Sequence, residues 1–327
     1  AVTTGIRNTL IGGEAGKALT DADFNVAVGF QALLSDTLGS RSVAVGYNAL
    51  VLQNKGSAFE MANVAIGMQA GENITTGYQN TAVGNEALNS DDTGRASVAV
   101  GFQALKTQNM DADEEAQNVA VGYQTSYHNV IGRGNTAVGF KAGAGASGNS
   151  HSNLVAIGAK AGQDITTGDS NTFVGASAGE SVTSANYNTF IGALAGDATD
   201  DGVSNVAIGY FSLSANCGDS NTAVGAEALK PCTGDSNSGL GNFALGSIQG
   251  GDQNSAVGEQ AGRSITSGSN NLCLGYQAGF TGSPGGNVTT EDNHIVLGDE
   301  NITSANVQVD WGIASDERDK TDFADLN

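Results

Sequence analysis

The stretch Asn25-Val-Ala-Val-Gly-Phe-Gln-Ala-Leu33 decides the fold, because the chain repeats it with small changes from end to end. It returns almost unchanged as Ser42-Val-Ala-Val-Gly-Tyr-Asn-Ala-Leu50 and as Ser97-Val-Ala-Val-Gly-Phe-Gln-Ala-Leu105. The shared pattern has eight positions and can be written Asn/Ser-x-Ala-Val/Ile-Gly-x-x-Ala, where x is a variable residue. Self-similarity at a short, fixed period is typical of a repeat protein.

The central glycine of the pattern gives the period, and we number each repeat so that this glycine is position 5. Successive central glycines are 16 to 23 residues apart, and 17 is the commonest spacing. They are Gly12, Gly29, Gly46, Gly67, Gly84, Gly101, Gly122, Gly139, Gly158, Gly175, Gly192, Gly209, Gly225, Gly241, Gly258, Gly275 and, in a degenerate repeat, Gly298. The spacing predicts an all-β repeat solenoid of about 17 coils of about 17 residues.

Each repeat carries the signals of two short strands and two turns. The alternation in Val-Ala-Val has the period of two that a strand requires, and the glycine after it permits a bend or a close backbone approach. A second glycine near position 15, as in residues 74–77 and 165–168, indicates a turn. Asn or Ser at position 1 would form a ladder that satisfies turn amides.

Positions 9 and 12 vary together. In seven repeats position 9 is Leu, whereas in eight it is Gly, and in five of those eight a bulky aliphatic residue stands at position 12, as with Gly71 and Ile74. One bulky side chain for each coil is therefore expected to fill one internal void, from either of two positions, because protein interiors conserve packed volume.

Composition and charge exclude several kinds of protein. The chain has 327 residues, with 48 Gly, 2 Pro, 6% aromatic residues and a net charge of −21, so it cannot fill a thick globular core. Such an acidic surface repels nucleic acid and anionic lipid. The favoured explanation of the acidic charge is that it keeps an elongated particle soluble. The less favoured explanation is that it binds a cationic partner, or a partner bridged by divalent ions.

No apolar run is long enough for a membrane helix, so no membrane insertion is expected. The chain starts Ala1-Val-Thr-Thr4, without an initiator Met or a signal peptide, which is typical of a fragment or a processed product. Cys217, Cys232 and Cys273 are expected to be buried free thiols.

A single chain has few large side chains with which to offset the entropy of ordering each coil. We therefore expect further apolar burial from neighbouring copies, with the small residues at fixed positions allowing identical chains to approach one another closely.

Two features resemble known families. The Ser-Val-Ala-Val-Gly and Asn-Thr-Ala-Val-Gly repeats at 42–46, 97–101, 80–84 and 135–139 are similar to the head repeats of trimeric autotransporter adhesins. That resemblance spans about residues 8–298 and implies a left-handed trimeric β-roll, and hence a homotrimer. The period of 17 is longer than that family's, and neither a stalk nor a membrane anchor follows.

The second resemblance lies in the tail from Trp311 to Asn327, with its Ala-Ser315-Asp316-Glu-Arg and Lys320. It resembles the start of the endosialidase-type intramolecular chaperone at the C-terminus of phage tail fibres and tail spikes. The resemblance implies self-cleavage at Ser315–Asp316, with Ser315 as nucleophile and Lys320 as its base. Without the chaperone body, no such activity is expected here, and no other enzymatic activity is expected.

These resemblances divide the chain into a solenoid shaft at 1–300, an exit segment at 301–315 and a chaperone remnant at 316–327. They imply a structural and adhesive segment of a homotrimeric phage tail fibre, which is extracellular and part of the virion. Its implied partners are a host-surface receptor, for which a glycan is one candidate, and other virion tail proteins. The alternatives are the head of a bacterial trimeric surface adhesin, which a downstream membrane anchor would favour, and a glycan depolymerase tail spike.

Loops are the expected place for receptor binding, since protruding loops on a rigid scaffold usually carry function. Two long coils give loops near 53–62 and 108–117 that should protrude from one flank, and two further bulges lie at 144–153 and 280–293. The candidate receptor-binding residues are Asn54, Lys55, Phe59, Asp111, Asp113 and Glu114. No metal site and no cofactor is expected, because the acidic loop lacks a calcium-loop pattern. Aromatic residues recur at position 6, where seam packing between subunits is favoured over sugar stacking.

Overall fold

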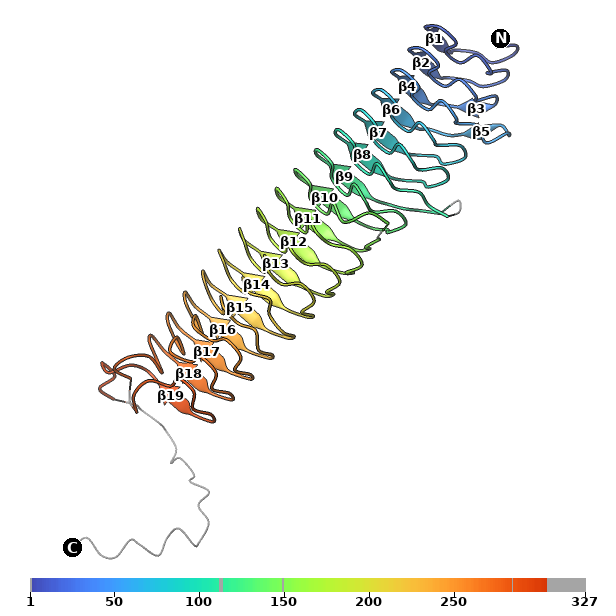
Figure 1. Cartoon of the computed structure of the whole chain (residues 1–327). Coiled ribbons are helices and arrows are strands. Elements are labelled where there is room, and N and C mark those ends of the chain that lie inside the picture. Colours follow the sequence, from blue (N-terminus) through green and yellow to red (C-terminus); the bar gives the residue numbers. More distant parts are fainter. Residues whose placement is uncertain (1, 112–113, 149, 284, 305–327) are drawn as a thin grey trace, which may run out of the picture.

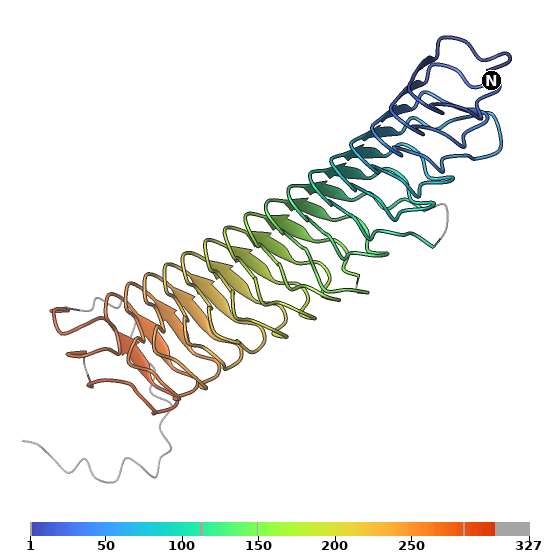
Figure 2. The same ribbon diagram turned by 45° about the horizontal axis from the view of Figure 1, so that its top comes forward.

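The computed structural model describes residues 2–111, 114–148, 150–283 and 285–304. The described chain is all-β and winds into one long rod, with the N-terminal coils at one end and the C-terminal coils at the other (Figures 1 and 2). The repeat β-solenoid predicted from the period is therefore confirmed. Within the described residues there is no helix, and hence none that could cross a membrane.

One strand of three residues from each coil joins a parallel sheet of 17 strands that runs the length of the rod. Each strand pairs with that of the next coil at the same repeat position, as Val26 pairs with Val43 and Ala27 with Ala44. The strands are β1 (Thr9–Ile11), β2 (Val26–Val28), β4 (Val43–Val45), β6 (Val64–Ile66), β7 (Thr81–Val83), β8 (Val98–Val100), β9 (Val119–Val121), β10 (Thr136–Val138), β11 (Val155–Ile157), β12 (Thr172–Val174), β13 (Thr189–Ile191), β14 (Val206–Ile208), β15 (Thr222–Val224), β16 (Ser238–Leu240), β17 (Ser255–Val257), β18 (Leu272–Leu274) and β19 (Ile295–Leu297).

The predicted second strand of each coil is wrong for most of the described chain. Only β3 (Gly39–Ser40) and β5 (Phe59–Glu60) form a second, two-stranded sheet, next to a single bridge between Arg95 and Glu115. After the central glycine, residues such as Gln31 and Leu33 have φ of 57° and 53°, in the left-handed region. That conformation ends the first strand of each coil, while backbone hydrogen bonds still join successive coils beyond it, as from Leu33 N to the carbonyl of Ala49 (3.0 Å).

The central glycines permit the coils of one chain to stack closely. Gly46 has φ of +139°, and a Cβ built on it would lie 2.3 Å from the carbonyl oxygen of Gly67 in the next coil. The middle strand residues, such as Ala27 and Ala44, are fully buried inside the coil. Small residues at these positions therefore pack within one chain, and the expectation that small residues let identical chains approach one another stays a prediction.

The expected ladder at position 1 is present and buried. The side-chain oxygen of Asn171 accepts a hydrogen bond from the backbone N–H of Asn188 (2.9 Å), and its amide donates to the carbonyl of Ala185 (2.8 Å). Where position 1 is Ser97, the side chain of Gln108 supplies the missing amide: it donates to Ser97 Oγ (3.1 Å) and accepts from Asn118 (2.8 Å). The same substitution occurs around Ser42 and Gln53.

One internal void for each coil is filled from position 9 or position 12, as predicted. In three coils the void is filled from other positions. The leucines at position 9 and the aliphatic residues at position 12 are buried. In the three coils where Gly143, Gly196 and Gly279 have no bulky partner at position 12, other residues fill the space. Leu154, at position 1 of the next coil, lies beside Gly143, and Phe190, at position 3 of the same coil, lies beside Gly196. Cys273 and Val288 lie beside Gly279.

The three cysteines are free and buried, as expected. Burial raises the pKa of Cys217 and Cys273 to about 11 and that of Cys232 to about 12. Because the thiolate is the reactive form, these thiols act as small apolar side chains.

Candidate functional site

The chaperone-like tail lies outside the described residues. Ser315, Asp316 and Lys320 belong to it, so self-cleavage remains a prediction from resemblance. The solenoid strands themselves end with β19, whereas the boundary at 300 and the exit segment 301–315 remain untested.

The first candidate loop, 53–62, is held by its own side chains. The ammonium of Lys55 lies 4.2 Å from the ring centre of Phe59 and 4.5 Å from that of Tyr78. The two rings meet edge to face at 4.9 Å. The side-chain oxygen of Asn54 accepts from Gly56 N (3.1 Å) and Thr37 Oγ1 (3.0 Å). Asn54, Lys55 and Phe59 thus order the loop, and their remaining exposed surface is what could contact a partner.

The second candidate loop, 108–117, lies on the same flank of the rod, three strands further along (Figure 1). Asp111 is exposed, and Asp113 lies outside the described residues. Glu114 forms an ion pair with Arg133, and Glu115 lies 3.6 Å from Arg95. Arginines from other parts of the chain therefore pair with both glutamates of this loop. In the described parts of the chain, no cluster of His, Cys, Asp and Glu could hold a metal.

The outward face of the long sheet carries one row of apolar side chains next to a row in which Val, Ile and Leu alternate irregularly with Thr and Ser. The third residue of each strand points away from the core, and many of these side chains are exposed, Ile157 by 40% and Val257 by 46%. The exposed members are Ile11, Ile66, Val121, Val138, Ile157, Ile191, Ile208, Leu240, Val257, Leu274 and Leu297. We call this row the outward stripe. Such a row is unusual on a soluble monomer, which rarely leaves a large contiguous apolar patch open to water.

Aromatic side chains at position 6 add to the outward stripe. The rings of Phe30 and Tyr47 stack at 5.8 Å, and those of Phe102, Tyr123 and Phe140 form a continuous stack with spacings of 5.3 and 5.4 Å. All five rings are exposed. They form flat apolar surfaces next to the stripe, which extends the area available to another protein.

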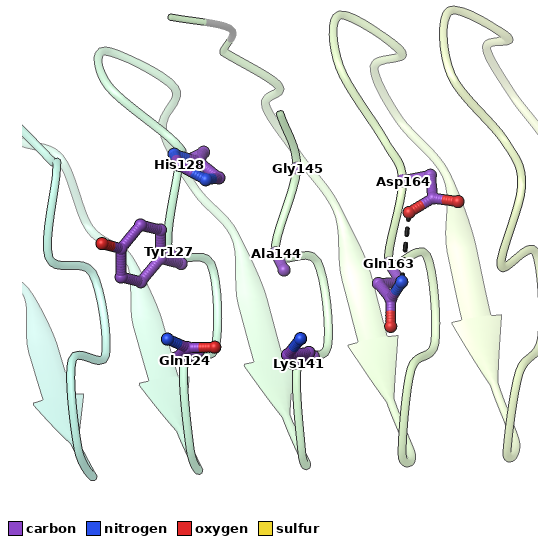
Figure 3. Close-up of a pocket in the computed structure, with 8 residues that line it drawn as sticks. All are labelled: Gln124, Tyr127, His128, Lys141, Ala144, Gly145, Gln163 and Asp164. Carbon is purple, nitrogen blue, oxygen red and sulfur yellow. Dashed lines mark hydrogen bonds between the residues drawn. The ribbon is translucent and has the colours of Figure 1, made fainter. Parts of the chain in front are cut away.

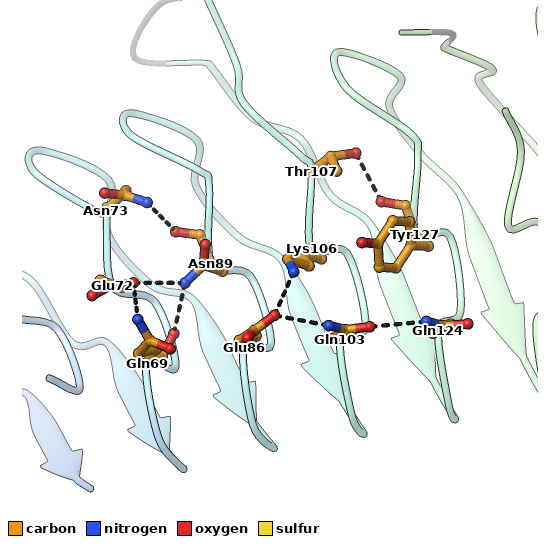
Figure 4. A network of polar contacts seen from close by, with 10 residues as sticks. All are labelled: Gln69, Glu72, Asn73, Glu86, Asn89, Gln103, Lys106, Thr107, Gln124 and Tyr127. Carbon is orange, nitrogen blue, oxygen red and sulfur yellow. Dashed lines mark hydrogen bonds and ion pairs between the residues drawn. The ribbon is translucent and has the colours of Figure 1, made fainter. Parts of the chain in front are cut away.

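A polar ladder follows position 7, where the chain turns away from the sheet (Figure 4). Gln103 donates to Glu86 (2.8 Å), and Gln124 donates to Gln103 (2.9 Å). Glu86 also pairs with Lys106, and the hydrogen bond to Lys106 is the main cause that lowers the pKa of Glu86. This ladder runs along the flank towards the coils of β9, β10 and β11.

A hollow at those three coils was missed by the sequence reasoning (Figure 3). It has a volume of about 370 Å³ and is lined by Gln124, Tyr127, His128, Lys141, Ala144, Gly145, Gln163 and Asp164. The longer spacing between Gly139 and Gly158 predicts the bulge at 144–153 but not the hollow beside it. The signal was present: Ala144 and Gly145 are small where the adjacent coils carry Tyr127 with His128 and Gln163 with Asp164.

Comparison with known proteins adds no identity: no family model and no curated protein matches this chain. Its function is therefore argued from the outward stripe and the loops.

Proposed function

We propose that the chain is the structural and adhesive shaft of a homotrimeric fibre, with a viral tail fibre as its setting and a host surface as its target. The observation that carries this proposal is the outward stripe, which runs the length of the solenoid. Burying such a row against identical chains removes apolar area from water, which is the main favourable term in association.

The regular register of the sheet supports association of identical chains. Because every strand of the long sheet pairs in parallel at the same repeat position, the stripe keeps one side chain per coil along the rod. A second copy could lie alongside over many coils, and the contact area would grow with the length of the rod. The number three comes from the resemblance of the repeats to trimeric adhesin heads. The net charge of −21 argues against nucleic acid as a partner.

Light scattering coupled to gel filtration tests the proposal, with a mass of three chains expected for the wild type. The variant Ile191→Asp/Ile208→Asp places two charges on adjacent strands of the stripe and should dissociate the trimer. Ser184→Asp/Ser267→Asp adds the same charge at exposed turns and should leave the mass unchanged. A wild-type chain that is folded and monomeric in dilute solution would reject the proposal.

A bacterial setting shares this architecture, because the repeats themselves resemble adhesin heads. The two settings differ in what the complete coding sequence encodes after Asn327: a membrane-anchoring segment favours the bacterial adhesin, and a complete chaperone domain favours the viral fibre.

A further inference from the structure

The hollow between the coils of β9, β10 and β11 exists because of one local change in side-chain size. Positions 10 and 11 carry Ala144 and Gly145 in the middle coil, between larger side chains at the same positions on either side (Figure 3). The larger neighbours, Tyr127 with His128 and Gln163 with Asp164, form two walls, and Gln124 and Lys141 at position 7 form the floor. All three coils are held in register by the sheet, so the hollow is preformed.

One lining residue of the hollow, His128, has a buried ring nitrogen without a partner, and two further such residues, His151 and Ser126, are not part of the lining. Both ring nitrogens of His151, Nδ1 of His128 and Oγ of Ser126 are buried and have no hydrogen-bond partner among the described residues. His151 is 1% exposed. A Cβ built on Gly145 would lie 3.7 Å from the Cβ of His128 and 3.8 Å from Cε1 of His151. Buried polar atoms are normally paired with protein, water or ligand, so the unpartnered Nδ1 of His128 in the lining favours a polar ligand.

The polar ladder at position 7 is also interrupted at the hollow. On one side Gln124 donates to Gln103 (2.9 Å), and on the other Lys160 pairs with Glu180 (2.9 Å). Lys141 stands between them, and no described carboxylate forms an ion pair with it. Its ammonium is 5.7 Å from the ring centre of Phe140. Lys141 therefore has donors to offer at the floor of the hollow.

We propose that this hollow binds an uncharged saccharide unit through its hydroxyl groups. A sugar hydroxyl both donates and accepts, and the walls offer both functions: Lys141 donates, Asp164 accepts, and the amides of Gln124 and Gln163 do either. The ring of Tyr127 supplies an apolar surface for the sugar's C–H groups. The inference rests on the proposed adhesive function, and it names the ligand class and a site away from the predicted loops.

Other ligand classes fit less well. An apolar ligand would remove the ammonium of Lys141 from water without offering it a partner, at a cost in free energy. The other polar groups have partners of their own, because Gln163 donates to Asp164 (3.2 Å) and Gln124 donates to Gln103 (2.9 Å). A phosphate or sulfate requires clustered cations, whereas Asp164 lies opposite the single lysine and the chain carries a charge of −21. The volume of about 370 Å³ lies at the small end of ligand pockets, which suits one or two sugar units.

Saturation-transfer NMR of the whole chain tests the inference. The probes are a panel of neutral mono- and disaccharides built from glucose, galactose, mannose, rhamnose and N-acetylglucosamine, with inorganic phosphate as the anionic probe. At least one neutral sugar should bind the wild type, and phosphate should not compete with it. No binding by any sugar in the panel, or binding by phosphate alone, would overturn the proposal.

Three variants locate the binding. Ala144→Leu fills the hollow with the residue that Leu34 provides at the same position of another coil, and it should abolish binding. Gln124→Ala should weaken binding about 5- to 10-fold, through the loss of one hydrogen bond. Gln277→Ala is the matched control: Gln277 has φ of 51°, against 50° for Gln124, and donates to Gln260 at 3.1 Å, so binding should be unchanged. Binding unaffected by Ala144→Leu would place the sugar elsewhere.

Failure here can be told apart from failure of the proposed function. Circular dichroism of each variant shows whether the solenoid is folded, and light scattering shows its oligomeric state. A folded trimer without sugar binding would reject this site alone, and a sugar-binding monomer would reject the trimeric fibre alone.

Discussion

At the scale of single residues, two buried carboxylates depart from the ordinary placement of acidic groups. Asp36 and Asp91 are fully buried, 55 residues apart, each at position 12 of the coil that precedes one of the two coils in which position 1 is Ser. Asp91 Oδ2 accepts from Gln108 Nε2 (2.6 Å), and its Oδ1 accepts from Gly94 N (3.1 Å). Each aspartate thereby orients the glutamine that replaces the missing Asn amide, and this is why a charge is retained in the interior.

Burial raises the pKa of Asp91, because removal from water disfavours its charged form more than the hydrogen bonds from Gln108 and Gly94 favour it. A carboxyl whose folded pKa lies above its unfolded pKa stabilises the fold at low pH. That contribution is lost as the pH rises through the folded value.

The prediction concerns the variant Asp91→Asn. Its melting temperature minus that of the wild type should increase as the pH rises from the acidic to the neutral range, because the variant has no buried charge to form. Asp92→Asn removes the same charge at the neighbouring, less buried carboxylate and serves as control. Thermal unfolding followed by circular dichroism measures both differences, and parallel slopes for the two variants would contradict the assignment to Asp91.

At the scale of the coil, one void is filled from whichever position supplies a side chain. Phe190, at position 3, is fully buried, and a Cβ built on Gly196 would lie 2.4 Å from its ring. In the coil of Gly29, position 3 is Ala27 and position 9 is Leu33, which has φ of 53°. Gly196 has φ of 59°. The two solutions therefore use nearly the same backbone, and they should be interchangeable.

The element-scale prediction is an exchange of these solutions. Phe190→Ala alone should cost about 3–5 kcal/mol by leaving a cavity, and Gly196→Leu alone should destabilise the fold by overpacking against Phe190. The double variant should recover most of the loss, since it recreates the arrangement of Ala27 and Leu33. Urea unfolding of all four proteins gives the coupling energy, and additive losses would show that the two positions do not share one void.

At the scale of the whole molecule, an apolar stripe and a large negative charge oppose each other. Association through the stripe removes apolar area from water, but it also brings acidic rods of charge −21 together. The balance should depend on salt, because ions screen repulsion between exposed charges.

The molecular-scale prediction is that salt strengthens the trimer. Raising NaCl from roughly 0.02 M to 0.5 M should shift the monomer–trimer equilibrium towards trimer, as the Debye length falls from tens of ångströms to a few. Sedimentation velocity over a dilution series measures this equilibrium. A trimer that dissociates as salt is added would indicate that ion pairs, and not the stripe, hold the chains together.

Several parts of the candidate sites could be predicted from sequence, and others could not. The loops of Lys55 and Glu114 follow directly from the longer spacings between glycines. Their internal pairing with Tyr78 and Arg133 could not be predicted, because those partners come from other coils. The hollow was missed for the same reason: its walls come from three coils, and only the stacking sets Ala144 between Tyr127 and Gln163.

The solenoid, its period, its register and the ladder at position 1 could be predicted from the repeat, because a repeated residue meets its own equivalent in the next coil. Which surfaces stay open to water follows from the closure of each coil in three dimensions. Most coils of the described chain form a single strand, whose middle residue faces the interior. This arrangement leaves Val, Ile and the position-6 rings facing water, and that outcome depends on how the coil closes in space, which the period of a repeat does not specify.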